Sequence, residues 1–410
     1  MGKKITYLIG AGASASAVPV VANMHQRMEE FSEALKGMKK NVFDSSYQHD
    51  DLTREIVQNQ HILNNILDDI NWVVSEAGNY YSIDTLAKTY FLKKERDKLL
   101  RLKRCLIIYF TLEQYLFIPS KKKKNYLFEK NKIDKRYTSF IAAIAKTQSY
   151  LSSNHLFPKE KNESFSIELN GEIKFLSWNY DLQFEISLTR FFTDKKIHFT
   201  KNNFQIFPNE DSLSDPENII MDADKFSMIK LNGNAIWDES KNGQNLRYTN
   251  TVYDSYVKVH ENEILLGYFL KQFSQFSFFD PNGAINESLS IFNFAWEIDE
   301  NFRDKYAGHS KNLEFAEKIA EETDILVVIG YSFPIFNREI DNRLFDKMNK
   351  LKKVYIQDFN PAKIESTMRN AFRVMGVPNS LPLYDREYNV DVLLESNTNQ
   401  FVIPYELYQE

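Results

Sequence analysis

The sequence predicts an α/β fold in which a parallel β-sheet is interrupted by a large helical insertion. Three observations predict it: an apolar strand that runs into a glycine-rich turn at Ile5–Ser14, a long stretch with helical periodicity after it, and alternating helices and apolar strands in the rest of the chain. Helices that alternate with apolar strands are typical of parallel sheets, because each crossover places a helix on a face of the sheet. We therefore expect a sheet domain formed by residues 1–24 and 165–410, with a mostly helical insertion at 25–164.

The opening segment reads as a short buried strand, Thr6–Ile9, that ends in a run of small residues. That run contains Gly10, Ala11, Gly12 and Ser14. A glycine turn between a strand and a helix lets backbone N–H groups approach a phosphate, with the positive end of the helix dipole behind them. Many folds hold a dinucleotide in this way. A tight turn without a ligand is the alternative, because no third glycine follows Gly12.

The helical insertion is predicted from apolar residues that recur at spacings of three and four. Two such series are Ile62, Leu63, Ile66, Leu67 and Ile70, and Leu99, Leu102, Leu106, Tyr109, Leu112 and Leu116. The basic run Lys121–Lys124 that follows them favours a solvated loop, and a docking patch for an acidic partner is the alternative.

Four more apolar strands are predicted after the insertion, and a polar or glycine-containing turn follows each one. The strands are Ile173–Ser177, Phe226–Leu231, Ile325–Ile329 and Val354–Gln357. Helices are expected at Glu314–Glu322, after Asn337 as the N-cap, and after Pro361. The carboxyl ends of parallel strands meet at one edge of a sheet, where open α/β sheets bind ligands. We therefore expect these turns and the opening turn to meet around one ligand.

Composition and charge exclude several classes of protein. The net charge of −5 argues against general nucleic-acid binding, which needs a basic surface. Cys105 is the single cysteine, so neither a disulfide framework nor a site with several thiolates is expected. No apolar run approaches the ~20 residues of a membrane span, and a strand at the start of the chain leaves no room for a signal peptide. We therefore expect a cytoplasmic protein without a membrane partner.

Five segments, taken in order, resemble the sirtuin-like fold, and specifically the bacterial sirtuin-like proteins of antiphage defence. They are GAGAS (Gly10–Ser14), WNYD (Trp178–Asp181), KLNG (Lys230–Gly233), GYSF (Gly330–Phe333) and DFNP (Asp358–Pro361). The resemblance implies a Rossmann-like site for NAD, with NAD cleaved as a substrate at its nicotinamide–ribose bond. It also implies a homo-oligomer, and relatives of this kind often act beside a ring-shaped ATPase of the HerA type.

The resemblance assigns NAD-binding roles to residues in three of these turns. They are Gly10, Ala11, Gly12 and Ser14 for the pyrophosphate, Gly330 and Ser332 near the adenosine ribose and phosphates, and Asn360 near the adenine ribose. For Ser332 and Asn360 a purely structural role is the alternative. The polar residues Asn337, Arg338, Asp341 and Arg343 are expected to cap and decorate one helix rather than to contact phosphate.

The resemblance assigns catalytic roles to Asn179, Asp181 and Asn232. Asn179 would orient the ribose and the attacking water, and Asp181 would hold the nicotinamide carboxamide. Each has a structural alternative, because Asp181 precedes a predicted helix that it could cap and Asn179 could satisfy backbone groups of its turn. Asn232 stands where the family usually has a histidine base, and it could instead hydrogen-bond a ribose hydroxyl.

The chain departs from deacylating sirtuins in two ways. Their four-cysteine zinc ribbon cannot be built from Cys105 alone, so no zinc is expected, and the amide of Asn232 cannot act as a base near neutral pH. Hydrolysis of NAD is still expected, because nicotinamide leaves as a neutral molecule and the oxocarbenium-like transition state accepts water readily. Loss of a general base costs only ~10²–10⁴-fold in rate. The alternatives are a catalytically silent NAD- or ADP-ribose-binding module and an ADP-ribosyltransferase.

A base could also come from elsewhere in the chain. The candidates are His25, His49, His61, His155, His198, His260 and His309, and the sequence selects none of them.

Overall fold

A parallel seven-stranded sheet forms the centre of the computed structural model, in the order β5-β6-β4-β1-β7-β8-β9. The structure describes residues 2–44, 51–116, 133–150, 164–189, 191, 204–208, 218–234, 262–275, 292–297, 307–372, 375 and 390–408. The strands are β1 (Ile5–Ile9), β4 (Ile173–Ser177), β5 (Phe204–Phe207), β6 (Phe226–Lys230), β7 (Ile325–Ile329), β8 (Lys353–Gln357) and β9 (Asp391–Glu395). The predicted α/β class is confirmed.

The central strands are buried on both faces, which explains why they read as continuous apolar runs. Every residue of β1, β4, β6 and β7 is buried. Within β1, Leu8 packs into the core on one face of the sheet, and Tyr7 and Ile9 pack into the core on the other. The sequence did not predict the four-residue strand β5 or the outermost strand β9, which is partly exposed.

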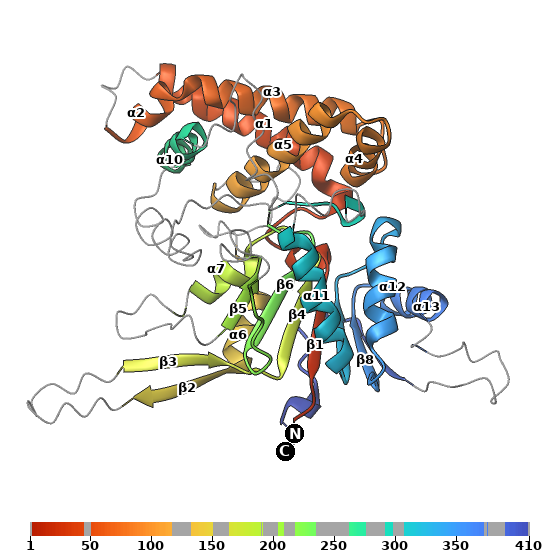
Figure 1. Cartoon of the computed structure of the whole chain (residues 1–410). Coiled ribbons are helices and arrows are strands. Elements are labelled where there is room, and N and C mark those ends of the chain that lie inside the picture. The colour runs from red at the N-terminus through yellow and green to blue at the C-terminus, as the bar shows by residue number, and fades with distance from the viewer. Residues whose placement is uncertain are drawn as a thin grey trace, which may run out of the picture.

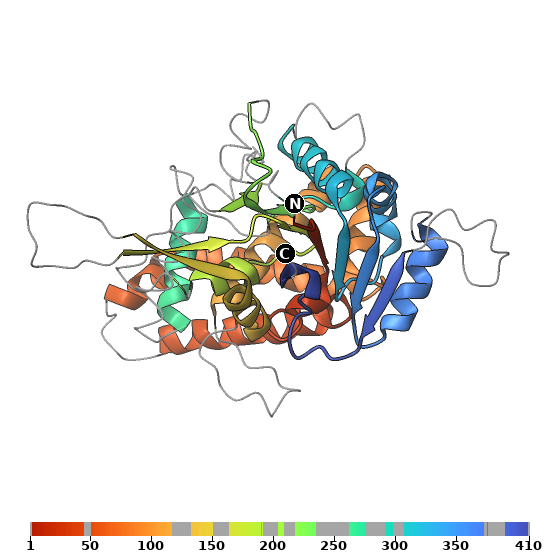
Figure 2. The same cartoon turned by 90° about the horizontal axis from the view of Figure 1, so that it is seen from below.

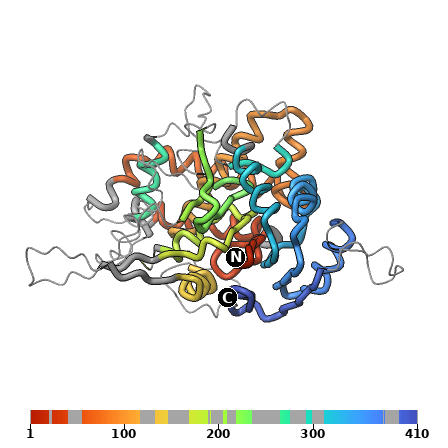
Figure 3. The backbone as a smooth tube through the Cα atoms, turned by 60° about the horizontal axis from the view of Figure 1, so that its bottom comes forward, coloured from red at the N-terminus to blue at the C-terminus, as the bar shows by residue number. Residues whose placement is uncertain are grey.

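Helices cover both faces of this sheet. On one face lie α11 (Ala307–Glu322), α12 (Arg338–Lys347) and α13 (Pro361–Ala371). On the other lie α6 (Lys135–Ile144), α7 (Gln183–Thr189) and the C-terminal segment that includes η8 (Tyr405–Tyr408). The hydroxyl of Tyr7 on β1 donates a hydrogen bond to Val402 O, so the C-terminal segment is fixed beside the first strand. Figures 2 and 3 show the two ends of the chain close together.

A separate layer of helices with its own apolar core lies over the carboxyl ends of the strands (Figure 1). Its members are α1 (Val21–Asp44), α2 (Asp51–Gln58), α3 (Gln60–Ala77), α4 (Ile83–Leu92), α5 (Arg96–Tyr115) and α10 (Asn262–Gln275). We call these six helices the helical layer. None of the helices that the structure describes is long and apolar enough to cross a bilayer.

The packing of two helices differs from the predicted division of the chain. Helix α6 lies inside the predicted insertion, 25–164, but Tyr137, Phe140 and Ile141 pack into the core of the sheet. Helix α10 lies outside that range, yet it packs on α2 and contributes Leu266 to the core of the helical layer. Strands β2 (Ala145–Tyr150) and β3 (Ser164–Leu169) form an antiparallel pair that projects from the body of the molecule (Figure 1). The lysine run 121–124 lies outside the described residues.

Candidate active site at the carboxyl edge of the sheet

The register of the sheet brings all five predicted turns to one edge. Ile9, the last residue of β1, pairs with Ser177 of β4 on one side and with Ile329 of β7 on the other. Ser177 in turn pairs with Lys230, the last residue of β6. Ile329 also pairs with Gln357, the last residue of β8. Because the strands are parallel and end at the same level, the turns that follow β6, β4, β1, β7 and β8 lie side by side along this edge.

The glycines of the opening turn allow it to pack directly on the turn after β7. Gly10 N donates to Ile329 O at 3.0 Å, and Gly12 N donates to Gly330 O at 3.0 Å. A Cβ atom at Gly10 would lie 2.6 Å from Gly330 O, and one at Gly12 would lie 2.8 Å from Gly330 Cα. Gly330 has a φ of +58°, and a Cβ there would lie 2.5 Å from Ala13 N. The contact between the two turns therefore requires all three glycines.

The opening turn differs from the expected phosphate cradle in two respects. The Gly12 N–H group already has a backbone partner, Gly330 O. In the described stretch after Gly10 the chain forms a 3₁₀ helix, η1 (Ala11–Ser14), and the α-helix α1 begins only at Val21. The sequence predicted that the positive end of a helix dipole would lie directly behind the glycines. In the structure α1 begins further along the chain, so its dipole does not start there. The close packing of the opening turn on the turn after β7 therefore explains Gly10 and Gly12 at least in part, without a ligand.

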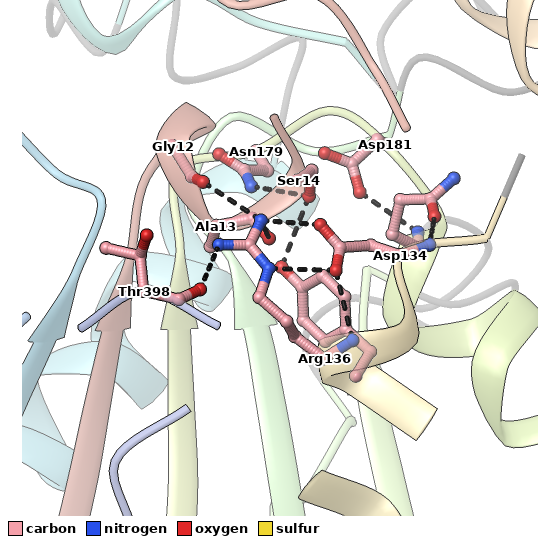
Figure 4. A network of polar contacts seen from close by, with 10 residues as sticks. Gly12, Ala13, Ser14, Asp134, Arg136, Asn179, Asp181 and Thr398 are labelled. Atoms are coloured by element: carbon pink, nitrogen blue, oxygen red, sulfur yellow. Dashed lines mark hydrogen bonds and ion pairs between the residues drawn. The ribbon is translucent and has the colours of Figure 1, made fainter. Parts of the chain in front are cut away.

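Ser14 and Asn179, which are far apart in the sequence, meet at this edge (Figure 4). Asn179 Nδ2 donates to Ser14 Oγ at 3.2 Å, and the Asn179 backbone N–H donates to Ser177 Oγ at 3.2 Å. Ser14 Oγ also lies 3.2 Å from the hydroxyl of Tyr137 on α6. Ser14 and Asn179 are both buried. These contacts join the opening turn to the turn after β4.

Asp181 lies beside this pair and also serves the helix that follows it. Its Oδ1 accepts a hydrogen bond from Gln183 N, the first residue of α7, at 2.9 Å. Burial raises the pKa of Asp181, while the Gln183 N–H, the charge of Lys230 and the Ser14 hydroxyl act in the opposite direction. Lys230 Nζ donates to Asp181 O at 2.7 Å and pairs with Glu185 Oε1 at 2.5 Å. The helix-capping interpretation of Asp181 thus has structural support.

Asn232, the residue at the usual histidine position, follows β6 at the same edge. Its Nδ2 donates to Trp178 O at 3.2 Å, and its backbone carbonyl accepts from Asn293 N at 3.0 Å. Asn232 is 5% exposed, and its Oδ1 has no hydrogen-bond partner among the described residues. An unsatisfied buried acceptor costs ~1–3 kcal/mol, so a hydroxyl or amide donor of a ligand would be favoured at this oxygen.

The helical layer is fixed directly to the turn after β4. Gln114 of α5 accepts a hydrogen bond from Leu182 N at 2.8 Å through its Oε1. The Tyr180 ring packs between Phe110 of α5 and Phe292, with ring centroids 5.8 and 4.3 Å away. The helices therefore close over the edge at which Asn179 and Asp181 lie.

A second link joins the helical layer to the segment beside Asn232. Lys103 of α5 is buried, and its Nζ pairs with Glu297 Oε2 at 2.6 Å and donates to Asn293 Oδ1 at 3.2 Å. Asn293 N donates in turn to Asn232 O. Burial raises the pKa of Tyr180, and the charge of Asp84 on α4 raises it further. Burial also raises the pKa of Asp84, to about 6.

Sequence reasoning missed a clamp that α6 places on the opening turn (Figure 4). Arg136 donates to Ala13 O at 2.9 Å and to Gly12 O at 3.3 Å. Its guanidinium also binds both carboxyl oxygens of the buried Asp134, at 2.9 and 2.5 Å. Asp134 N donates to Gln183 Oε1 at 2.8 Å, which connects the clamp to α7. The one local signal was Asp134 as the N-cap of α6, where Oδ1 accepts from Arg136 N at 3.1 Å.

The remaining predicted cofactor residues lie on the surface. Ser332 is exposed in the turn after β7. Asn360 is exposed after β8, and its Oδ1 accepts from Lys363 N at 3.3 Å, so it caps α13. Asn337 occupies the N-cap position of α12, but its side chain does not cap the helix as predicted, because its Nδ2 donates to the Tyr331 hydroxyl at 3.0 Å.

The histidines that the structure describes with side chains lie on the helical layer. His25 is exposed on α1, with its Nε2 2.8 Å from Val74 O, and His61 is exposed on α3. His49, His155, His198 and His260 lie outside the described residues, as does the side chain of His309. Among the side chains described, no group of three or more His, Cys, Asp or Glu residues could hold a metal ion.

A comparison of the sequence with protein-family models found no matching family, and a comparison with curated proteins found no significant match.

Proposed function

We propose that the chain is an NAD⁺ glycohydrolase, which cleaves the bond between nicotinamide and ribose. The observation that supports it most strongly is the 3.2 Å hydrogen bond between Asn179 Nδ2 and Ser14 Oγ. The proposal needs the opening turn and the WNYD turn to lie within reach of a single dinucleotide, and this contact meets that requirement. Asp181 and Asn232 lie at the same edge of the sheet, on the turns that follow β4 and β6.

The proposed chemistry needs little acid or base assistance. The bond between C1′ and the nicotinamide nitrogen breaks, and its electron pair neutralises the pyridinium charge of the leaving group. Water bonds to C1′ of the oxocarbenium-like ribose and releases its proton to solvent, which gives nicotinamide, ADP-ribose and H⁺. The chain would contribute mainly orientation, and a correctly held water can account for several kcal/mol of the barrier.

Three side chains have distinct roles in this proposal. Asn179 orients the ribose and the attacking water. The unpartnered Oδ1 of Asn232 accepts a hydrogen bond from a ribose hydroxyl, and Asp181 holds the nicotinamide carboxamide. Asn232 takes part as a hydrogen-bonding group and not as a base, because its amide does not titrate near neutral pH.

The test is to mix the purified chain with NAD⁺ and follow the release of nicotinamide by chromatography. Wild-type chain is expected to release nicotinamide, and Asn179→Ala is expected to lower turnover by about 10²-fold. Asn349→Ala is the matched control, because this exposed asparagine lies in the turn that leads into β8, at the opposite edge of the sheet. Full turnover in Asn179→Ala would remove Asn179 from the mechanism, and no turnover under any condition, including with a partner ATPase, would contradict the enzyme proposal.

A second candidate is a binding module that holds NAD or ADP-ribose without cleaving it. The observation that favours it is the asparagine at position 232, together with the surface location of both histidines whose side chains are described. Calorimetry with NAD⁺, followed by analysis of the recovered nucleotide, separates the two candidates. Tight binding with NAD⁺ recovered uncut supports the binding module.

We further propose that the activity is gated in antiphage defence, because an ungated NAD hydrolase would damage its own cell. The proposed form is a homo-oligomer that acts beside a ring-shaped ATPase of the HerA type. Size-exclusion chromatography with light scattering tests the oligomer. A monomer at all concentrations would contradict it.

A further inference from the structure

A buried carboxylate behind the candidate site links two of its turns. Asp341, in the first turn of α12, is fully buried. Its Oδ1 accepts from Trp178 Nε1 at 3.2 Å, and its Oδ2 accepts from the Tyr331 hydroxyl at 2.8 Å. Trp178 belongs to the turn after β4, and Tyr331 belongs to the turn after β7. Asp341 was expected only to lie on the surface of one helix, but it joins α12 to the turn after β4 and to the turn after β7.

The two rings that bind Asp341 also pack on each other. The indole of Trp178 stacks on the ring of Tyr331, with centroids 6.1 Å apart and planes 16° from parallel. Asn337 Nδ2 donates to the same Tyr331 hydroxyl at 3.0 Å. Trp178 and Tyr331 are both buried. The indole therefore has one position, which is set by the carboxylate on its edge and by the ring on its face.

The position of Trp178 matters because its chain neighbour is Asn179. Trp178 N donates to Ile9 O at 2.9 Å, and Trp178 O accepts from Asn232 Nδ2 at 3.2 Å. Movement of the indole would therefore shift the backbone from which Asn179 reaches Ser14, as well as the acceptor that orients Asn232. On the other side, Tyr331 follows Gly330, whose carbonyl accepts from Gly12 N.

The helix dipole favours an acidic side chain in the first turn of α12, but by less than the burial of a carboxylate costs. Burial of a carboxyl group costs free energy, and an apolar side chain of similar size would fill the space without that cost. The basic side chains further along α12 pair with α11, Arg343 with Glu317 at 2.5 Å and Lys347 with Glu321 at 2.8 Å. What the carboxylate provides, and an apolar group would not, is two acceptor oxygens that face donors on two different turns.

We propose that Asp341 is a positioning residue for the candidate site, which acts through the Trp178 indole to hold Asn179 and through Tyr331 to hold the turn after β7. The proposal rests on the proposed function only in that Asn179 contacts the ligand. Its structural part is independent of catalysis, because it predicts how firmly residues 178–182 are held.

The structural part is tested by hydrogen exchange on the free chain. Asp341→Asn is compared with Asp346→Asn, an exposed aspartate on the same helix. In Asp341→Asn, the amides of 178–182 are expected to exchange about 10-fold faster, while peptides of the helical layer keep their wild-type rates. Unchanged exchange at 178–182 would overturn the proposal.

The catalytic part is tested by a double-mutant cycle. Asp341→Asn is expected to lower kcat for NAD⁺ cleavage by about 10-fold with KM nearly unchanged, because a misplaced Asn179 affects the transition state most. In an Asn179→Ala background, Asp341→Asn is expected to cause no further loss. A full additional 10-fold loss in that background would overturn the proposal.

The proposal can still be tested if Asp341→Asn does not fold or if the wild-type chain is inactive. If Asp341→Asn does not fold, Tyr331→Phe removes one donor and leaves the carboxylate in place, and it is expected to give the same exchange pattern with a smaller amplitude. Wild-type exchange at 178–182 in Tyr331→Phe would then overturn the proposal. If the wild-type chain releases no nicotinamide, the proposed function fails, and the exchange experiment still decides whether Asp341 holds residues 178–182.

Discussion

At the scale of single residues, the candidate site depends on amide side chains. Asn179 and Asn232 lie on adjacent turns, and each has a donor bonded within the protein. Their carbonyl oxygens are the atoms that can face a ligand, and that of Asn232 is buried without a partner among the described residues. An asparagine pair of this kind can orient hydroxyl groups and water, but it cannot remove a proton near neutral pH.

Replacement of Asn232 separates binding from stability. In Asn232→Ala we expect turnover or NAD affinity to fall by about 10-fold, because an acceptor for a ribose hydroxyl is lost. The free energy of unfolding should change by less than about 1 kcal/mol, since loss of the bond to Trp178 O is offset by removal of an unsatisfied oxygen. Calorimetry and urea unfolding measure the two quantities. A large loss of stability with unchanged binding would contradict the assignment.

Asp341 should make stability depend on pH. Burial raises the pKa of Asp341 from 3.8 to about 7, so the unfolded chain loses this proton at a lower pH than the folded chain does. The contribution of Asp341 to stability is therefore fully present below pH ~4 and is lost as the pH rises to ~7. Relative to Asp341→Asn, the wild-type chain should lose roughly 2–4 kcal/mol between pH 4 and 8. Urea unfolding of both chains at several pH values checks this, and a constant difference would contradict it.

At the scale of elements, the turn after β1 is shaped by its neighbours more than by its own sequence. Gly12 O and Ala13 O accept from Arg136 of α6, and Gly12 N donates to the turn after β7. The parallel register predicted that the turns would meet, and they do. The clamp was not predictable, because Arg136 lies far from the turn in sequence. An arginine near the start of a helix does not indicate which carbonyl or carboxylate groups it will bind.

Removal of the clamp should destabilise the chain and loosen the opening turn. Arg136→Ala leaves the buried carboxylate of Asp134 without its cation, so we expect a loss of roughly 3 kcal/mol in the free energy of unfolding. The exposed Ser139→Ala on the same helix is the control and should change stability by less than about 0.5 kcal/mol. Chemical unfolding measures both. The double variant Arg136→Ala, Asp134→Asn should recover part of the loss, and no recovery would show that Asp134 is not the source of the cost.

The strands and helices with strong periodicity were the predictable ones. Strands β1, β4, β6, β7 and β8 and helices α3, α5, α12 and α13 lie where the sequence placed them, with small differences at their ends. Helix α11 ends at Glu322 as predicted but begins at Ala307, seven residues before the predicted start. Strand β5 has only four residues, and β9 is an edge strand with exposed leucines, so neither has the apolar run of a buried parallel strand. The packing of α6 on the sheet depends on contacts made by Tyr137 and Phe140, and an amphipathic pattern does not reveal its partner.

At the scale of the whole molecule, the helical layer lies over the edge where the predicted site residues gather (Figure 1). Gln114 of α5 connects it to the turn after β4, and Lys103 of α5 connects it through Asn293 to the turn after β6. A movement of this layer, such as one caused by assembly or by a partner, would therefore shift the positions of Asn179 and Asn232. The sequence indicated a helical layer and a sheet edge, but nothing in it indicated that one covers the other.

The most direct measurement is a crystal structure of the Asn179→Ala chain with NAD⁺ bound, since slow turnover would preserve the intact dinucleotide. We predict one NAD molecule across the turns after β1, β4 and β6, with a ribose hydroxyl on Asn232 Oδ1 and the anomeric carbon beside position 179. A dinucleotide bound away from this edge, or an edge that stays empty at saturating NAD⁺, would contradict the account.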